Sequence, residues 1–207
     1  MKREYSKNDF FTQKAKEENY PARSVYKLQE IDEKFKIFKK GDWVLDLGAA
    51  PGSWLLYIGN KVSMTGGVIG VDILDLNIEI LNNTKFIKKN ILDTDSLDFI
   101  SPLPTSGVGR EGSFDAVVSD MAPNTTGLLQ VDVANCLELT RKALEIAQKR
   151  LAKGGKFVCK IFEGSGVDLF VKETKRHFKS IKRYRPQAVR KGSKEIYLIA
   201  KGFSPQP

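Results

Sequence analysis

Residues that commonly bind metal ions are scarce in this sequence. Its 207 residues include two cysteines, Cys136 and Cys159, and a single histidine, His177. The two cysteines lie far apart, without the close spacing that pairs of zinc ligands show. We therefore expect no metal site.

Long apolar runs are also missing. No stretch approaches the roughly 20 consecutive apolar residues of a membrane-spanning helix, and the first residues, Met1 to Asn8, are polar rather than a signal-peptide core. An amphipathic, Arg-rich leader is absent as well. We expect a single-domain monomer in the cytoplasm without a membrane partner, with a mitochondrial, other organellar or nucleolar location as the alternative.

Acidic residues are few toward the C-terminal end, and this decides where the net charge of +9 lies. Residues 172–201 hold eleven Lys or Arg against two acids, Glu173 and Glu195. Residues 1–27 are also basic, so a polyanion such as nucleic acid would gain affinity by binding across both ends. The alternative is a solvated face that only keeps the protein soluble.

Several short, almost continuously apolar runs are typical of strands buried on both faces of a parallel sheet. They are Trp43–Leu47, Val68–Val71, Lys85–Ile87, Ala116–Ser119, Phe157–Ile161 and Ile196–Ala200. Helical patterns cover 24–35, with a possible Ser24 cap, 132–151, which Gly154 and Gly155 would end, and 168–178. This order predicts a Rossmann-like, doubly wound α/β fold with a mostly parallel sheet and an antiparallel last strand. A flexible insertion is expected at about 101–113, where Gly, Pro and Ser are frequent.

A glycine-bearing turn follows the first of these strands, in the segment Asp46 to Trp54. Such turns allow close approach of a ligand at the carboxyl edge of a parallel sheet. The glycines, Gly48 and Gly52, are spaced G-x-x-x-G rather than G-x-G-x-x-G, which disfavours a pyrophosphate. Asp72 ends the next strand, where a carboxylate can accept hydrogen bonds from both hydroxyls of a ribose. A ribose without a pyrophosphate points to S-adenosylmethionine.

Five segments, in this order, make the chain resemble the FtsJ family of RNA 2′-O-ribose methyltransferases over nearly its whole length. They are Ala22–Leu28, Asp46–Trp54, Ser119–Asn124, Gly154–Lys160 and Ser193–Tyr197. The resemblance implies the class I methyltransferase fold and S-adenosylmethionine as the cofactor. It also implies an RNA substrate, which in the ribosomal branch is a uridine of the large-subunit RNA, either free or in an assembling subunit.

The family's K-D-K-E tetrad would fall on Lys27, Asp120, Lys160 and Glu195. The cofactor contacts that the resemblance implies are Gly48, Gly52, Trp54, Asp72, Asn90 and Asp120. The family usually has Asp where this chain has Asn90, so Asp93 is an alternative adenine contact. Trp54 has core packing as its alternative role.

Methyl transfer from a sulfonium is a direct displacement, so the ribose hydroxyl must be aligned and deprotonated. We assign Lys160 as the base, Asp120 as the group that orients it, Lys27 as the group that stabilises charge and Glu195 as a positioning group. The alternative is that the same four residues form two isolated surface ion pairs. Each pair would then contribute only about 0–1 kcal/mol to the stability of the fold.

The RNA should lie across the helix that carries Lys27 and the basic stretch near the C-terminus. The candidate RNA-binding residues are Arg23, Arg183, Arg185, Arg190 and Lys191. Two other functions stay open: 2′-O-methylation of transfer RNA, and a ribosome-assembly factor that binds RNA and cofactor without catalysis.

Overall fold

The computed structural model of the chain describes residues 10–93 and 113–205. The segment at about 101–113, where we expected a flexible insertion, lies outside the described residues except for Ser113. No helix within the two described ranges combines the length and apolarity needed to cross a membrane.

Helices and strands alternate along most of the chain. The helices are α1 (Phe10–Glu17), α2 (Val25–Phe35), α3 (Ser53–Val62), α4 (Leu129–Arg150) and α5 (Val167–Lys175), with a 3-10 turn η1 (Ile91–Asp93). The strands are β1 (Trp43–Leu47), β2 (Gly67–Asp72), β3 (Thr84–Lys88), β4 (Phe114–Ser119), β5 (Leu151–Phe162), β6 (Phe178–Tyr184) and β7 (Glu195–Phe203). All six strands expected from the sequence are present.

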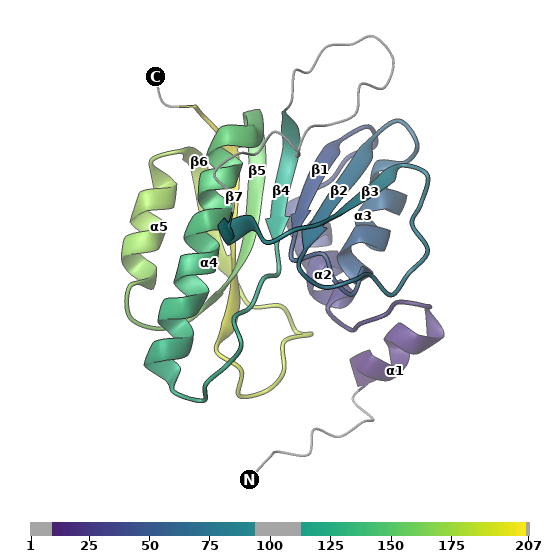
Figure 1. Cartoon of the computed structure of the whole chain (residues 1–207). Coiled ribbons are helices and arrows are strands. Elements are labelled where there is room, and N and C mark those ends of the chain that lie inside the picture. The colour runs from purple at the N-terminus through teal and green to yellow at the C-terminus, as the bar shows by residue number, and fades with distance from the viewer. Residues whose placement is uncertain (1–9, 94–112, 206–207) are drawn as a thin grey trace.

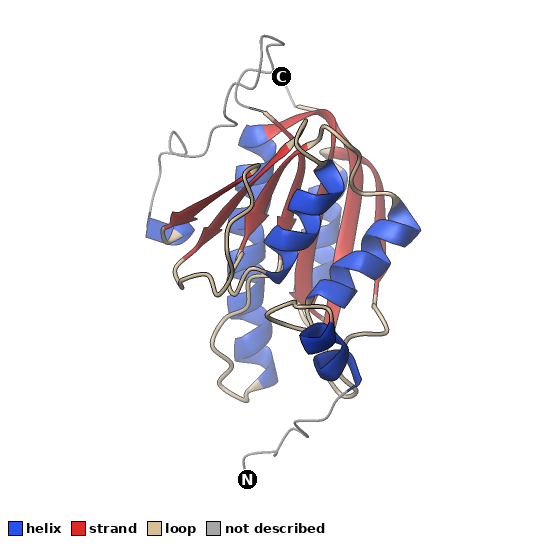
Figure 2. Cartoon of the chain, turned by 90° about the vertical axis from the view of Figure 1, so that its right-hand side faces the viewer, coloured by secondary structure: helices blue, strands red, loops and turns tan. Residues whose placement is uncertain are grey.

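The strands form one sheet in the order β3-β2-β1-β4-β5-β7-β6. Pairing is parallel from β3 through β5, while β7 runs antiparallel to both β5 and β6. Figure 1 shows α4 and α5 against one face of the sheet and α2 and α3 against the other, and Figure 2 shows these layers after a quarter turn. The expected doubly wound sheet with an antiparallel last strand is confirmed.

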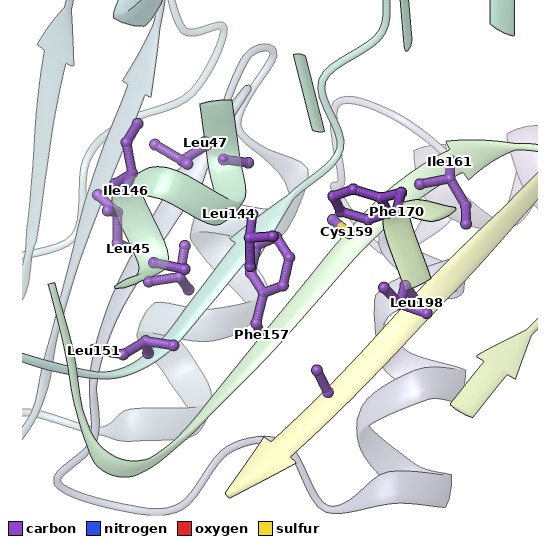
Figure 3. Close-up of a cluster of buried hydrophobic side chains, with 14 of the residues drawn as sticks. Leu45, Leu47, Leu144, Ile146, Leu151, Phe157, Cys159, Ile161, Phe170 and Leu198 are labelled. Carbon is purple, nitrogen blue, oxygen red and sulfur yellow. The ribbon is translucent and has the colours of Figure 1, made fainter. Parts of the chain in front are cut away.

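Each face of the sheet has its own apolar core, because alternate residues of a strand point to opposite faces. On the α4 and α5 side the core includes Leu45, Leu47, Phe157, Cys159 and Phe170, all without solvent exposure (Figure 3). The core on the α2 and α3 side contains the intervening strand residues, such as Val44 and Val158, together with Trp54 and Tyr197. Such layers build the stable platform that holds the strand ends in place.

Two local expectations are wrong, and one strand was missed. Ser24 makes no side-chain cap and is itself helical, because a turn through Ala22 and Arg23 already precedes α2. Gly154 and Gly155 do not end α4, which stops at Arg150; they lie in β5, where the pairing with β4 shifts register. The basic strand β6 was not expected, since an edge strand with exposed Lys and Arg has little apolar alternation to reveal it.

The antiparallel direction of β7 matters for function. The parallel strands β1, β2, β4 and β5 all have their carboxyl ends along the same edge of the sheet, the carboxyl edge. Because β7 runs the other way, its first residue, Glu195, lies beside Phe162 at the end of β5. Residues that end β4 and β5 and the residue that begins β7 therefore meet at the same edge.

The helix α2 is held against α3 by one buried carboxylate. Asp32 is 3% exposed, and its Oδ1 accepts hydrogen bonds from the backbone N–H groups of Ile37 at 2.9 Å and Phe38 at 3.0 Å. Its Oδ2 accepts the Tyr57 hydroxyl of α3 at 2.7 Å. Burial and this carboxylate raise the pKa of Tyr57, so the hydroxyl stays a donor.

Asp32→Ala should therefore destabilise the fold, by about 1–3 kcal/mol for each buried donor that is left without an acceptor. Urea unfolding measures the change in the free energy of unfolding. Glu33→Ala, one residue along and exposed, is the matched control and should shift it by less than about 0.5 kcal/mol. Equal, small effects of both substitutions would contradict this role of Asp32.

Candidate active site

Asp120 and Lys160 form the centre of a polar cluster at the carboxyl edge. Asp120 follows β4, and Lys160 lies near the end of the neighbouring strand β5, on the face that α2 and α3 cover. The Lys160 Nζ lies 3.0 Å from the Asp120 Oδ1 and also donates to the Asp120 backbone carbonyl. The Lys160 side chain is only 7% exposed. Two contacts to one residue fix the ammonium nitrogen in place.

Lys27 and Glu195 form the second ion pair of the cluster. Lys27 is on the first turn of α2, and its Nζ lies 2.5 Å from the Glu195 Oε1 at the start of β7. Each of the two side chains is 13% exposed. All four residues of the expected tetrad are thus brought together from four separate elements.

A fifth residue, Tyr197, connects the two pairs. Its hydroxyl lies 2.7 Å from the Asp120 Oδ1 and 2.9 Å from the Glu195 Oε1, so its single proton bridges the two carboxylates. Sequence analysis did not assign it a role. The sequence did contain a signal for this role, because Tyr197 is two residues from Glu195 on a strand and therefore shares its face. Tyr197 also pairs with Lys160 across β5 and β7.

The cluster is electrostatically balanced. Burial alone would raise the pKa of Asp120, but Lys160, Lys27 and the Tyr197 hydroxyl more than offset it, and the pKa lies below its ordinary value. Burial and the two carboxylates raise the pKa of Tyr197 well above its ordinary value. Asp120 is therefore an anion and Tyr197 a neutral donor at physiological pH.

A cavity of about 320 Å³ opens beside this cluster. Its polar lining includes Asp72, Asn90 and Asp120, and its apolar lining includes Ile73 and Ile91. Gly48 also lines it, with φ of +82°, and a Cβ there would come within 2.7 Å of the Met121 side chain. A cavity lined by both carboxyl groups and apolar side chains fits a cationic nucleoside.

Asp46 provides a separate test of this fit. It is fully buried on β1, and neither of its carboxylate oxygens has a hydrogen-bond donor among the described residues. Burial, then the carboxylates of Asp120 and Asp72, raise the pKa of Asp46 well above its ordinary value. The raised pKa favours the neutral form of Asp46, which does not line the cavity, so the carboxyl groups that the sulfonium and ammonium groups of S-adenosylmethionine would meet are those of Asp72 and Asp120.

Asp72 is positioned by backbone donors. Its Oδ2 accepts the N–H of Ala50 at 2.8 Å, and its Oδ1 accepts that of Leu74 at 2.9 Å. Each oxygen keeps a second lone pair for a ligand. Asn90 donates from its amide to Asp93 at 2.9 Å, so the two alternative adenine contacts are hydrogen-bonded to each other, and Asn90 is the one that lines the cavity.

Gly52 and Trp54 are placed differently from the other expected cofactor contacts, and neither lines this cavity. The Trp54 indole is 3% exposed, donates to the Ser24 carbonyl at 2.9 Å and packs near Tyr197. A Cβ on Gly52 would meet the Ile78 side chain at 2.6 Å. Both side-chain positions are used for packing, which leaves only their backbones for a ligand.

A second, basic groove of about 390 Å³ also contacts this cluster. Lys27 and Glu195 line it together with Arg23, Arg190 and Lys191. Arg23 donates to the Ala188 carbonyl, which ties the start of α2 to the loop between β6 and β7. The groove therefore contacts the tetrad at Lys27 and Glu195, whereas the cavity contacts it at Asp120.

The remaining two expected RNA contacts have intramolecular partners. Arg185 donates to two carbonyls of the loop between β6 and β7, those of Ser193 at 2.7 Å and Arg190 at 3.4 Å, and to that of Glu195 at the start of β7 at 3.2 Å. Arg183 forms an ion pair with Asp168 of α5, on the opposite face of the sheet from α2. Arg185 braces the wall of the groove, and Arg183 lies away from it.

No group of three or more His, Cys, Asp or Glu side chains in the described ranges is arranged to hold a metal ion. Both cysteines are free and buried in the core.

Known proteins resemble this chain in sequence. A family model for FtsJ-like methyltransferases matches residues 20–203. The ribosomal RNA large subunit methyltransferase E of Desulforapulum autotrophicum is 43% identical over 94% of this chain and 92% of its own length. The protein of that name from Halorubrum lacusprofundi is 37% identical over 98% of this chain and 73% of its own.

Solved structures also match. A candidate ribosomal RNA methyltransferase from Plasmodium falciparum superposes with a TM-score of 0.75 at 26% identity, over 90% of this chain and all of its own. A candidate methyltransferase from Streptococcus mutans, solved with S-adenosylhomocysteine, shares the fold with a TM-score of 0.51 at 14% identity, over 84% of this chain and 95% of its own. Together with the sequence relatives, the family match over most of its length shows that this chain belongs to the FtsJ-like methyltransferase family.

Proposed function

We propose that this methyltransferase transfers the methyl group of S-adenosylmethionine to a ribose 2′-hydroxyl of large-subunit ribosomal RNA, at a uridine. The observation that supports this most directly is the buried contact chain Lys27–Glu195–Tyr197–Asp120–Lys160 between an acidic cavity and a basic groove. The names of the relatives support the choice of ribosomal RNA. We further propose that the whole chain is one methyltransferase domain that acts as a monomer in the cytoplasm.

The cavity beside Asp72 would hold the cofactor. When bound, S-adenosylmethionine supplies a methyl group on a positively charged sulfur that is open to direct displacement. Asp72 would accept the ribose hydroxyls, Asn90 would contact the adenine edge, and Ile73 and Ile91 would cover its faces. Asp120, an anion that lines the cavity, would stabilise the positive charge.

The tetrad would act on the RNA. The ribose must enter from the basic groove, where the ammonium of Lys27 can donate to an oxygen of the nucleotide and stabilise negative charge that develops there. Lys160 in its neutral form would remove the 2′-hydroxyl proton, and Asp120 would hold its Nζ in line with the hydroxyl. Glu195 positions Lys27, and Tyr197 keeps the two carboxylates at a fixed separation.

Lys160→Ala should lower the single-turnover rate of methyl transfer by about two to four orders of magnitude, because a positioned base acts only in the chemical step. Binding of cofactor and RNA should survive. Lys156→Ala is the matched control, since Lys156 lies on the same strand and near a carboxylate, Asp42 at 4.0 Å, but at the other edge of the sheet. Near-normal chemistry in Lys160→Ala with none in Lys27→Ala would move the base to Lys27.

Asp72→Ala should weaken binding of S-adenosylmethionine about 10- to 150-fold, the equivalent of losing a charge-assisted contact worth about 1.5–3 kcal/mol. Isothermal titration calorimetry measures this directly. Asp75→Ala is the control, because Asp75 is in the same loop but its side chain is 78% exposed and paired with Lys88. Equal affinities of both variants would remove Asp72 from the cofactor site.

Lys191→Ala should reduce the slope of log affinity for RNA against log salt concentration by about 0.7–0.9, the value for one lost phosphate contact. Lys191 is exposed and lines the groove. Arg183→Ala removes the same charge outside the groove and should leave the slope unchanged. The reverse outcome would place the RNA on the α5 side of the sheet.

The substrate itself is tested in cells. Mapping of 2′-O-methyl groups on ribosomal and transfer RNA, with and without the gene, should show one site lost from the large-subunit RNA. Loss from transfer RNA alone would assign the other substrate. An unchanged map would leave a non-catalytic RNA-binding factor.

A further inference from the structure

Phe10, the first residue of α1, places a large aromatic ring on the surface. It is 70% exposed, more than any other large apolar residue in the described part of the chain. Its ring contacts that of Phe11 edge-on, with 5.3 Å between centroids and 73° between planes. Most of the Phe10 ring therefore faces solvent.

A loosely attached helix does not account for this exposure. Ala15 of α1 is 2% exposed in the core on the α2 side, and Lys14 places its Nζ 4.7 Å from the centroid of the Tyr26 ring. The Tyr26 hydroxyl donates to Glu18, just beyond α1, at 3.0 Å. These contacts hold α1 on α2, so the ring of Phe10 is presented from a fixed base.

Ring and guanidinium contacts lead from Phe10 to the basic groove. Phe11 lies 5.5 Å from the guanidinium carbon of Arg23 and 5.5 Å from the Tyr26 ring. Arg23 lines the groove with Lys27, the tetrad residue four positions along the chain. Figure 1 shows α1 beyond the edge of the sheet toward which β4 points, which is the edge where the tetrad lies.

We propose that the Phe10 ring is a stacking platform for an unpaired base of the RNA, close to the nucleotide that is methylated. The inference rests on the proposed function and extends it to the form of the substrate. Proteins bind single-stranded RNA with a basic groove that follows the phosphates and with aromatic side chains on which bases stack. Phe10 offers the aromatic face, while Arg23, Lys27 and Lys191 supply the neighbouring positive charge that disfavours a purely apolar partner.

Three variants separate stacking from general apolar contact. Phe10→Ala should weaken binding of a short single-stranded oligoribonucleotide about 5- to 150-fold in fluorescence anisotropy, the range for one lost stacked base. Phe10→Trp should bind at least as well as the wild type, and Phe10→Leu should bind less well than Phe10→Trp. The salt slope should stay unchanged in Phe10→Ala because no phosphate contact is lost.

Met64→Ala is the matched control. Met64 is 65% exposed, but it lies in the turn between α3 and β2, at the opposite edge of the sheet. Its removal should leave RNA affinity within about twofold of the wild type, a change of about 0.4 kcal/mol. An equal loss of RNA affinity in Met64→Ala and Phe10→Ala would show a nonspecific effect of surface apolarity. It would overturn the proposal that Phe10 stacks on a base.

A scan with single abasic nucleotides identifies the stacked base. One abasic position should weaken binding by the wild type and have no further effect on Phe10→Ala, whereas other positions should weaken both equally. Equal losses at every position, or wild-type affinity in Phe10→Ala, would overturn the stacking and leave the proposed function intact. Unchanged oligonucleotide binding with weaker binding to large ribosomal subunits would assign Phe10 to a protein contact instead. A wild-type protein that bound neither the oligonucleotide nor large ribosomal subunits would overturn both proposals.

Discussion

The site depends on keeping four charged side chains close together where little water reaches them. Burial of a charge costs more than a single ion pair returns, so such groups persist only with further hydrogen bonds. Here Lys160 has two contacts to Asp120, and the Tyr197 proton lies between Asp120 and Glu195. Removing one member would leave the others buried without their partner, which makes the cluster a single unit rather than two ion pairs.

That unit constrains the fold around it. Asp120, Lys160 and Glu195 come from adjacent strands, whose spacing the sheet determines. Lys27 comes from a helix, and nothing in the sheet sets its position. The buried Asp32, the indole of Trp54 on the Ser24 carbonyl and Arg23 on the Ala188 carbonyl hold α2 against α3 and the β6–β7 loop. The packing residues thus determine where Lys27 meets the groove.

The basic C-terminal stretch divides into residues with different tasks. Arg185 makes intramolecular hydrogen bonds that order the loop leading to Glu195. Arg183 balances Asp168 on the other face of the sheet and lowers the pKa of that carboxyl. Lys191 and Arg190 line the groove. The local excess of positive charge is therefore partly structural, and its groove-facing part lies beside the tetrad.

Local patterns in the sequence determined the inner strands and the main helices, whereas the resemblance to the FtsJ family supplied the candidate tetrad. Buried parallel strands are continuously apolar, and the turn after β1 together with Asp72 implied a nucleoside site because backbone chemistry at strand ends depends on a few adjacent residues. The strand β6 escaped notice because an edge strand rich in Lys and Arg lacks the apolar pattern of the inner strands. Ser24 was misjudged as a cap because capping depends on whether the preceding residues are already helical.

Only the tertiary structure decided which side chains meet. Tyr197 became a bridge because antiparallel pairing with β5 sets it beside Lys160, and the direction of β7 is a property of the whole sheet. Trp54 and Arg185 belong to residue types that suit a ligand contact, yet their partners, Ser24 and the loop carbonyls, approach from other elements. Sequence thus determined the chemistry available at each strand end, whereas long-range packing decided its use, because contacts between distant residues depend on the relative placement of whole elements.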